Sequence, residues 1–161
     1  MASIGSSHPE MPGAAQPRRT HPADPAAISH SLPLRVYYED TDAAGMVYHA
    51  NYLKFAERGR SEMLRSLGFP HRKLAAEEGV GFAVRRCAVD YLAPARLEDE
   101  LTVVTTLTKI GAATLAAHQE IRRKAELLAD IDILVACIGR DGRPRRLPSA
   151  LRVALVARET P

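Results

Sequence analysis

The stretch VYYEDTDAAGMVYHANYLKFAERGRSEML, residues 36–64, joins the end of a predicted strand to a polar loop and a predicted helix. Its first half is rich in functional side chains, with three carboxylates, one histidine and four tyrosines between residues 37 and 52. The surrounding chain is ordinary, 46% hydrophobic and without tryptophan. The density of polar groups beside a helix start raises the question whether residues 37–52 form only a turn or a reaction centre.

The two flanks of this loop predict different secondary structure. Before it, apolar and polar side chains alternate, with Leu34, Val36 and Tyr38 in one phase and Arg35, Tyr37 and Glu39 in the other. Such alternation is typical of a half-buried strand, so we expect the fold to begin near Leu34. After the loop, apolar residues recur every three or four positions, which predicts an amphipathic helix over residues 50–67 that Gly68 and Pro70 end. A short helical turn is expected over residues 71–78.

Beyond Gly81 the hydrophobic period changes to two, which predicts long strands joined by short polar loops. The predicted strands cover residues 82–91, 101–108, 115–122 and 127–137, and Leu151, Val153 and Leu155 form a last short one. The phase of the first strand slips at Arg85 and Arg86, where a β-bulge is the simplest explanation. We therefore predict an α+β fold in which a curved antiparallel sheet of about five to six strands wraps one long central helix.

The length of 161 residues predicts a single domain, which we place at residues 32–157. Residues 1–31 are rich in proline and almost lack aliphatic side chains larger than alanine, so they are predicted to be a disordered extension. Residues 158–161 are assigned to a C-terminal tail. One helix cannot cover a broad sheet with two open edges, so we expect pairing with a second copy of the chain.

Composition argues against several classes of protein. No apolar run approaches the roughly 20 residues of a membrane-spanning helix and no secretory signal is recognisable, so we expect a cytoplasmic protein. The net charge of +3 fits a partner that carries phosphate, but acidic and basic residues are interleaved and nucleic-acid binding is not indicated. Cys87 and Cys137 lie in apolar, strand-like sequence without metal-ligand spacing, so both are predicted to be reduced core residues.

The motif D-T-D-x-x-G-x-V-Y-H-x-N-Y at residues 40–52, followed by E-R-x-R-x-E at residues 57–62, resembles a known family. This family is the hotdog-fold acyl-CoA thioesterases of the 4-hydroxybenzoyl-CoA thioesterase class, and the tol-pal-associated YbgC type is most similar. The resemblance continues through FAVRRCAVDYLAPARLEDEL, residues 82–101, to about Leu155. It departs from the family at Ala56, where an aromatic residue is common, and at Gly59, where alanine is common. Glycine there should cost the helix about 1 kcal/mol relative to alanine.

The resemblance implies an acyl-CoA thioesterase that releases free acid and coenzyme A. No metal or redox cofactor is implied, since coenzyme A is part of the substrate, and the enzyme would be a homodimer or homotetramer. An acyl carrier protein is a further candidate partner. The alternative is a hotdog protein that binds an acyl carrier or a protein of lipid metabolism and hydrolyses thioesters only weakly. Turnover of acyl-CoA esters separates the two functions.

The same resemblance assigns the site residues. Asp42 matches the catalytic aspartate, and His49 is the second catalytic position. The backbone amide of His49, or those of its immediate neighbours, would donate hydrogen bonds to the oxyanion. A helix start suits this role because its first N–H groups lack partners. The substrate-binding residues are Gly45, Val47, Tyr48, Asn51, Arg85 and Arg86, with Arg123 and Lys124 as further candidates for the phosphates of coenzyme A. No metal ligand is predicted.

Several roles stay open at this stage. The sequence D-A-A-G at residues 42–45 is also an ordinary type I turn, which could itself hold Asp42. A carboxylate there can attack the thioester or deprotonate a water, and the small side chains of Ala43, Ala44 and Gly45 favour direct attack without deciding it. The His49 side chain fits a site role and a packing role equally.

Neighbouring residues are given structural roles. Asp40 is assigned to loop organisation, because a second carboxylate in one pocket would raise pKa values. Tyr38, Tyr48 and Tyr52 are predicted to be core or pocket wall. A metal site at Asp40, Asp42 and His49 lacks further ligands, and a nucleophile built from Cys87 and His118 lacks a local activating group.

Overall fold

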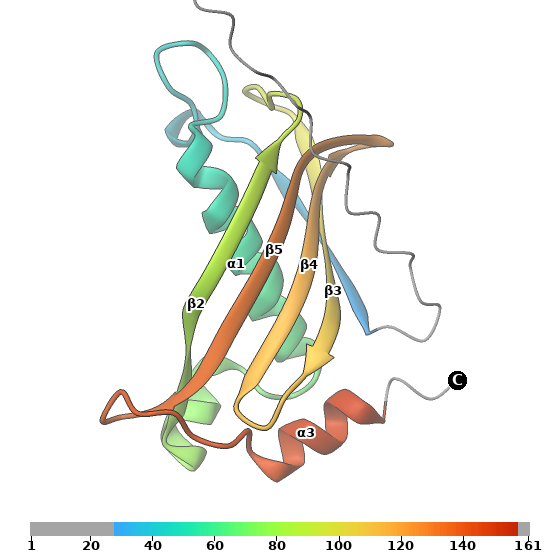
Figure 1. The fold of residues 1–161 in the computed structure, drawn as a ribbon. Coiled ribbons are helices and arrows are strands. Elements are labelled where there is room, and N and C mark those ends of the chain that lie inside the picture. The colour runs from blue at the N-terminus through green and yellow to red at the C-terminus, as the bar shows by residue number, and fades with distance from the viewer. Residues whose placement is uncertain (1–27, 158–161) are drawn as a thin grey trace, which may run out of the picture.

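The computed structural model describes residues 28–157, in which a five-stranded antiparallel sheet curves along one long helix (Figure 1). The helix is α1 (His49–Ser66). The strands are β1 (Ser29–Arg35), β2 (Val80–Tyr91), β3 (Glu100–Ile110), β4 (Thr114–Arg123) and β5 (Glu126–Gly139), in the order β1-β3-β4-β5-β2. The predicted hotdog architecture is confirmed.

Shorter helices fill the connections. A 3-10 turn, η1 (Tyr38–Asp40), precedes α1; α2 (His71–Lys73) and η2 (Leu74–Glu78) occupy the predicted short helical segment; and α3 (Ser149–Val156) ends the described chain. The predicted β-bulge is also confirmed, since the pairing of β2 with β5 shifts register between Val84 and Arg86. The loop before α1 lies at one end of the molecule and α3 at the other (Figure 1).

The prediction of a last strand near residue 153 is wrong, because these residues form α3. Leu151 and Leu155 are fully buried whereas Val153 is 67% exposed. Residues four apart share one face of a helix, so two leucines at that spacing bury together while the residue between them faces solvent. The helix follows Pro148, which occupies its N-cap position. Its leucines close the core at the end where α1 terminates.

The predicted start of the domain is also corrected. Strand β1 begins at Ser29, and the side chain of Ile28 is buried. The backbone carbonyl of Ile28 accepts a hydrogen bond of 2.9 Å from the amide of Leu107. The domain therefore includes Ile28 and does not begin at residue 32. The remainder of the predicted extension, residues 1–27, and the predicted tail, residues 158–161, lie outside the described residues.

The core forms two clusters, one around each half of α1. Between them the helix approaches the sheet closely at Gly59. A Cβ atom at this position would lie 2.8 Å from Val103 Cγ1 and 2.9 Å from Thr105 Oγ1, well inside normal contact. The close approach of α1 to β3 thus accounts for a glycine inside a helix, where the intrinsic preference opposes it.

Two predictions about burial are wrong, those for Cys87 and Tyr38. Cys137 is buried as expected, but Cys87 is exposed because β2 is an edge strand. Tyr52 is buried, whereas Tyr38 is 82% exposed. Tyr48 is 46% exposed, so it is not a core residue, and its predicted role as pocket wall stays a prediction. Strand β1 ends at Arg35, before the alternation reaches Tyr38, so the ring of Tyr38 does not continue the inward phase.

Candidate active site

The polar loop is a narrow hairpin closed by a bridge between Thr41 and Val47. The amide of Asp42 donates to the carbonyl of Met46 at 2.9 Å, and the amide of Gly45 donates to the carbonyl of Asp42 at 3.0 Å. Gly45 has a φ of 72°, a left-handed conformation that favours glycine. The turn expected over residues 42–45 is therefore present, and it carries Asp42 at its first position.

The carboxylate of Asp42 is exposed and held by one of its oxygens. Its Oδ1 accepts a hydrogen bond of 2.9 Å from the amide of Ala44, two residues further on. Among the described residues, no group donates to Oδ2. The side chain is thus oriented by the turn, while one oxygen remains available to attack a carbon or to accept a proton.

The start of α1 has no side-chain cap. The amide of Tyr48 donates to the Asp40 carbonyl at 2.9 Å, and that of Asn51 donates back to the Tyr48 carbonyl at 2.8 Å. Between them, the amides of His49 and Ala50 find no acceptor in the part of the chain that the structure describes. Unpaired N–H groups at the positive end of a helix dipole are suited to hold a developing oxyanion.

Asp40 organises this loop, as predicted. Its side chain is only 5% exposed, and its Oδ2 accepts a hydrogen bond of 2.9 Å from the amide of Tyr37. The buried side-chain amide of Asn51 donates to the backbone carbonyl of Asp40, also at 2.9 Å. The first turn of α1 is thereby tied to the segment that precedes Asp42.

A second loop, residues 92–99, supports the first. The amide of Val47 donates to the carbonyl of Ala95 at 2.9 Å, and the amide of Ala95 donates to Tyr52 Oη at 2.8 Å. Burial raises the pKa of Tyr52, which keeps the phenol neutral as a structural partner. The helix start, the hairpin and the second loop therefore form one hydrogen-bonded unit.

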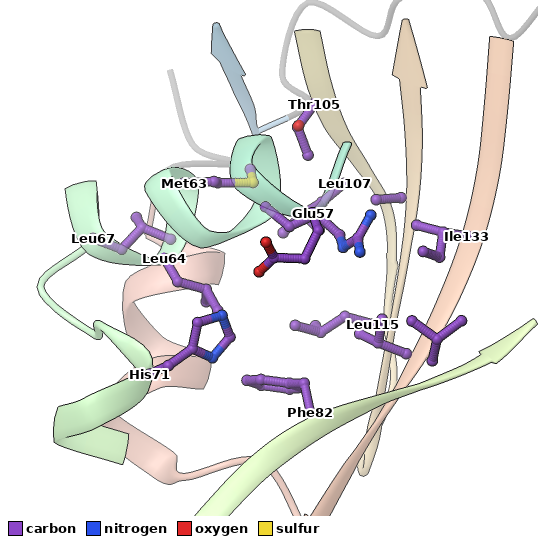
Figure 2. Close-up of a pocket in the computed structure, with 14 residues that line it drawn as sticks. Glu57, Met63, Leu64, Leu67, His71, Phe82, Thr105, Leu107, Leu115 and Ile133 are labelled. Carbon is purple, nitrogen blue, oxygen red and sulfur yellow. The ribbon is translucent and has the colours of Figure 1, made fainter. Parts of the chain in front are cut away.

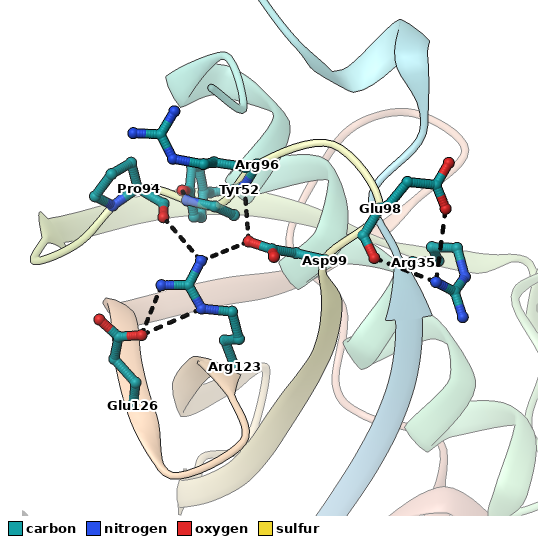
Figure 3. A network of polar contacts seen from close by, with 9 residues as sticks. Arg35, Tyr52, Pro94, Arg96, Glu98, Asp99, Arg123 and Glu126 are labelled. Carbon is teal, nitrogen blue, oxygen red and sulfur yellow. Dashed lines mark hydrogen bonds and ion pairs between the residues drawn. The ribbon is translucent and has the colours of Figure 1, made fainter. Parts of the chain in front are cut away.

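Arg123 anchors the second loop from β4 (Figure 3). Its guanidinium pairs with Asp99 at 2.6 Å and with Glu126 at 2.7 Å, and it donates to the carbonyl of Pro94 at 3.5 Å. Asp99 in turn accepts a hydrogen bond from the amide of Arg96. Arg123, predicted as a candidate for the phosphates of coenzyme A, is committed to this network instead.

The structure gathers part of the predicted site. Asp42, Gly45, Tyr48 and His49 lie together in the hairpin and at the helix start, all exposed. The rings of Tyr48 and His49 are 4.4 Å apart between centroids, and the carbonyl of His49 accepts a hydrogen bond of 3.0 Å from Tyr91 Oη.

The other predicted substrate contacts are placed differently. The side chains of Val47 and Asn51 are buried, so within one chain they support the loop and present no surface to a substrate. Arg85 and Arg86 are exposed at the bulge in the middle of β2, away from the hairpin. Lys124 lies in the turn between β4 and β5, with a positive φ of 55°.

The rejected nucleophile pair is separated by the sheet itself. Cys87 is aligned with Ile133, and His118 is aligned with Asp132, the adjacent residue of β5. Consecutive strand residues face opposite sides of a sheet, so Cys87 and His118 do not meet. Within residues 28–157, no group of three histidine, cysteine or carboxylate side chains has a metal-binding arrangement.

A cavity of about 130 Å³ lies between the second half of α1 and the sheet (Figure 2). Its walls are mainly apolar, with polar groups from Glu57, Arg60, His71 and Thr105. The apolar lining comes from Met63, Leu64, Leu67, Phe82, Val84, Leu107, Leu115, Ala117, Ile133 and Val135. The Asp42 hairpin does not line this cavity.

The sequence predicted neither the cavity nor its polar wall, although two signals were present. Arg60 belongs to the E-R-x-R-x-E segment, and Gln119 occupies an inward position between Ala117 and Ile121. A glutamine in the apolar phase of a strand indicates a buried polar contact, because an unpaired amide there would be costly.

No helix among residues 28–157 combines the length and the apolar character needed to cross a membrane.

The fold and the hairpin with its uncapped helix define a thioesterase of the hotdog type, and the comparisons agree. The model of the Thioesterase-like superfamily matches residues 36–155, and the chain belongs to this superfamily. It is 46% identical over 121 residues to the acyl-CoA thioester hydrolase YbgC of Escherichia coli O6:H1, covering 74% of this chain and 90% of that protein.

Two further relatives support the assignment. The acyl-CoA thioesterase YbgC of Haemophilus influenzae is 44% identical over 108 residues, which are 67% of this chain and 79% of that one. The crystal structure of a probable thioesterase from Bartonella henselae superposes with a TM-score of 0.73 at 40% identity, covering 75% of this chain and 100% of that one. The resemblance drawn from the motif is thus confirmed.

Proposed function

We propose that this chain hydrolyses acyl-CoA thioesters through Asp42 and the start of α1. One observation carries the proposal: a carboxylate with one fixed and one free oxygen stands in the loop that leads into a helix whose His49 and Ala50 amides have no acceptor. Thioester hydrolysis needs a group that attacks or activates water, and donors for the oxyanion. Acyl-CoA hydrolysis is also the activity named for the YbgC relatives.

The reaction can follow two routes with the same residues. In one, Asp42 attacks the carbonyl carbon, the carbon–sulfur bond breaks, coenzyme A leaves and water hydrolyses the mixed anhydride. In the other, Asp42 accepts a proton from the water that attacks the same carbon, and the carbon–sulfur bond then breaks so that coenzyme A leaves. The amides of His49 and Ala50 hold the oxyanion in both. A carboxylate, water and backbone amides supply each step, so the proposal includes no metal or redox cofactor.

The site is completed by a second copy of the chain. Strand β2 is an edge of the sheet, with Val84 57% exposed and Tyr91 47% exposed. At the end of β2, the hydroxyl of Tyr91 donates a hydrogen bond to the carbonyl of His49, the first residue of α1. At the beginning of β2, Phe82 lines the cavity beside the end of α1. Helix and strand are therefore antiparallel neighbours.

Antiparallel pairing of β2 with its copy would set the Asp42 hairpin of one subunit beside the cavity of the other. This arrangement accounts for the absence of Asp42 from the lining of its own cavity. The cavity, about 130 Å³, approaches the roughly 150 Å³ that accommodates benzene, so the acyl group would be short or a single ring.

The same chemistry could act on a thioester carried by an acyl carrier protein, because the reacting thioester is alike. We also infer a cytoplasmic location, since Cys87 and Cys137 are both free thiols and unpaired cysteines are typical of reducing compartments.

The test is turnover of a panel of acyl-CoA esters of two to twelve carbons by the wild type and by Asp42→Asn. We expect hydrolysis of the short esters, and a kcat about 10² to 10⁴ lower in Asp42→Asn, the usual contribution of a positioned acid or base. Circular dichroism and melting temperature serve as controls for folding. Hydrolysis by Asp42→Asn within a few-fold of the wild type would remove Asp42 from the mechanism. A wild type that binds these esters without turnover would favour the binding-protein alternative.

A further inference from the structure

Arg60 reaches from α1 to a buried glutamine of the sheet. Its Nη1 donates to Gln119 Oε1 at 2.7 Å. Gln119 is fully buried, and its Nε2 donates to the Ala56 carbonyl at 2.9 Å and to Thr105 Oγ1 at 2.7 Å. These contacts fix the amide so that its oxygen faces Arg60. The guanidinium is therefore held in one place against the cavity wall, with most of its N–H groups uncommitted.

The guanidinium of Arg60 forms no ion pair with a carboxylate of the described residues. No carboxylate lies within 4.0 Å of its guanidinium among residues 28–157, whereas Arg123 has two such partners. Glu57 also lines the cavity and its negative charge acts on Arg60, but its carboxylate does not contact the guanidinium within 4.0 Å and instead accepts a hydrogen bond of 2.6 Å from Ser61. Burial lowers the pKa of Arg60, an effect that the charge of Glu57 opposes. A half-buried cation without an ion pair in a ligand-sized cavity is a place for an anion.

The position of Arg60 connects this charge to the substrate path. Arg60 lines the cavity and also the adjoining open groove beside Leu53, Lys54 and Cys87. An acyl group entering the cavity from the groove would pass its guanidinium. A carboxylate on the acyl group would form the direct ion pair that Arg60 lacks among the described residues, and could accept two of its free N–H groups in the paired geometry that guanidinium favours.

We propose that Arg60, positioned by Gln119, is a specificity-determining residue that selects short acyl groups carrying a terminal carboxylate. This inference rests on the proposed thioesterase function and adds a substrate class to it. A neutral hydroxyl would leave the charge uncompensated, which is why the carboxylate is preferred. A carboxylate of the partner subunit is the competing occupant, and the experiment below distinguishes it.

The experiment compares kcat/KM for adipoyl-CoA and hexanoyl-CoA, which have equal carbon number and differ in the terminal carboxylate. We expect the wild type to prefer adipoyl-CoA by about tenfold or more, and Arg60→Met to lose this preference while hydrolysing hexanoyl-CoA within about threefold of the wild type. Gln119→Glu keeps Arg60 but supplies an internal carboxylate, so the preference should fall there too. The matched control is Arg65→Met, because Arg65 is an exposed arginine of α1 that lines neither the cavity nor the groove.

Each outcome decides the proposal. An equal loss on both substrates in Arg60→Met would assign Arg60 to folding or to the partner subunit and overturn the inference. If the wild type hydrolyses hexanoyl-CoA but does not prefer adipoyl-CoA, the inference about Arg60 is overturned and the thioesterase function stays intact. A wild type inactive on both esters and on the panel above would overturn both.

Discussion

Asp42 illustrates how much of the proposed active site is formed by local contacts. The turn over residues 42–45 orients the carboxylate through the Ala44 amide, so its position depends on four consecutive residues. The side chains beside it are minimal, and a Cβ atom on Gly45 would meet no atom within 4 Å. A thioester carbonyl can therefore approach the free oxygen closely, which favours direct attack over a bridging water.

Direct attack predicts a covalent intermediate on Asp42. In a single turnover in ¹⁸O-labelled water with enzyme in excess, we expect hydroxylamine to trap an adduct on the peptide that contains Asp42. If water attacks the aspartyl side of the anhydride, ¹⁸O also appears in Asp42, as mass spectrometry of that peptide would show.

The general-base route predicts a different pattern. Label would then appear only in the released acid, and hydroxylamine would trap nothing on the enzyme. That combination would contradict the nucleophilic role of Asp42. Label in the product accompanied by a trapped adduct would mean that water attacks the acyl side of the anhydride.

At the scale of elements, the approach of α1 to the sheet depends on Gly59. We expect Gly59→Ala to lower the free energy of unfolding by about 1 to 2 kcal/mol, because crowding against Val103 and Thr105 outweighs the gain in helix preference. Urea denaturation measures this change. The matched control is Gly81→Ala, where a Cβ atom meets nothing within 4 Å. A stabilised Gly59→Ala variant would show that the helix can move away from the sheet at small cost.

The first strand provides a second test at this scale. A chain that begins at Leu32 lacks Ile28, whose side chain is buried, and the first part of β1 that pairs with β3. Relative to a chain that begins at Ile28, we expect a loss of roughly 2 to 5 kcal/mol, as for removal of a large buried aliphatic side chain. Equal melting temperatures for the two chains would place the domain boundary at residue 32 after all.

At the scale of the whole molecule, the proposal is that two chains together form the active site. Asp42→Asn leaves the cavity intact, and Ala117→Phe fills the cavity but leaves the hairpin intact. A mixed dimer of these two inactive variants would contain one site with both functional parts. Random assembly from equal amounts should therefore restore about a quarter of the wild-type rate.

The complementation test needs co-expressed, differently tagged subunits, with sedimentation to establish the oligomeric state. Each variant alone should remain folded and inactive. A mixed dimer without activity would mean that Asp42 and the cavity act within one chain, or that the cavity does not bind the acyl group.

Features that depend on neighbours in sequence could be predicted. The helix over residues 49–66, the bulge between Val84 and Arg86 and the turn that holds Asp42 all follow from local spacing and turn chemistry. The motif also placed Asp42 beside the start of α1, because the two lie a few residues apart, and their catalytic role stays a prediction. The burial of residues on edge strands was harder to predict from the sequence. Cys87 has the pattern of a core residue, and only its place on an edge strand leaves it exposed.

What the sequence determined by itself was the strand–loop–helix unit and the turn that orients the Asp42 carboxylate within it, since contacts between near neighbours form them. Only the tertiary structure decided that the residues around Leu151 form a helix, because closing the end of the core selects the helical spacing of its leucines. The tertiary structure likewise brought Arg60 to Gln119, 59 positions apart, in the wall of a cavity. Such contacts join segments that are distant in the sequence, so a local sequence pattern does not predict which inward-facing polar groups will be in contact.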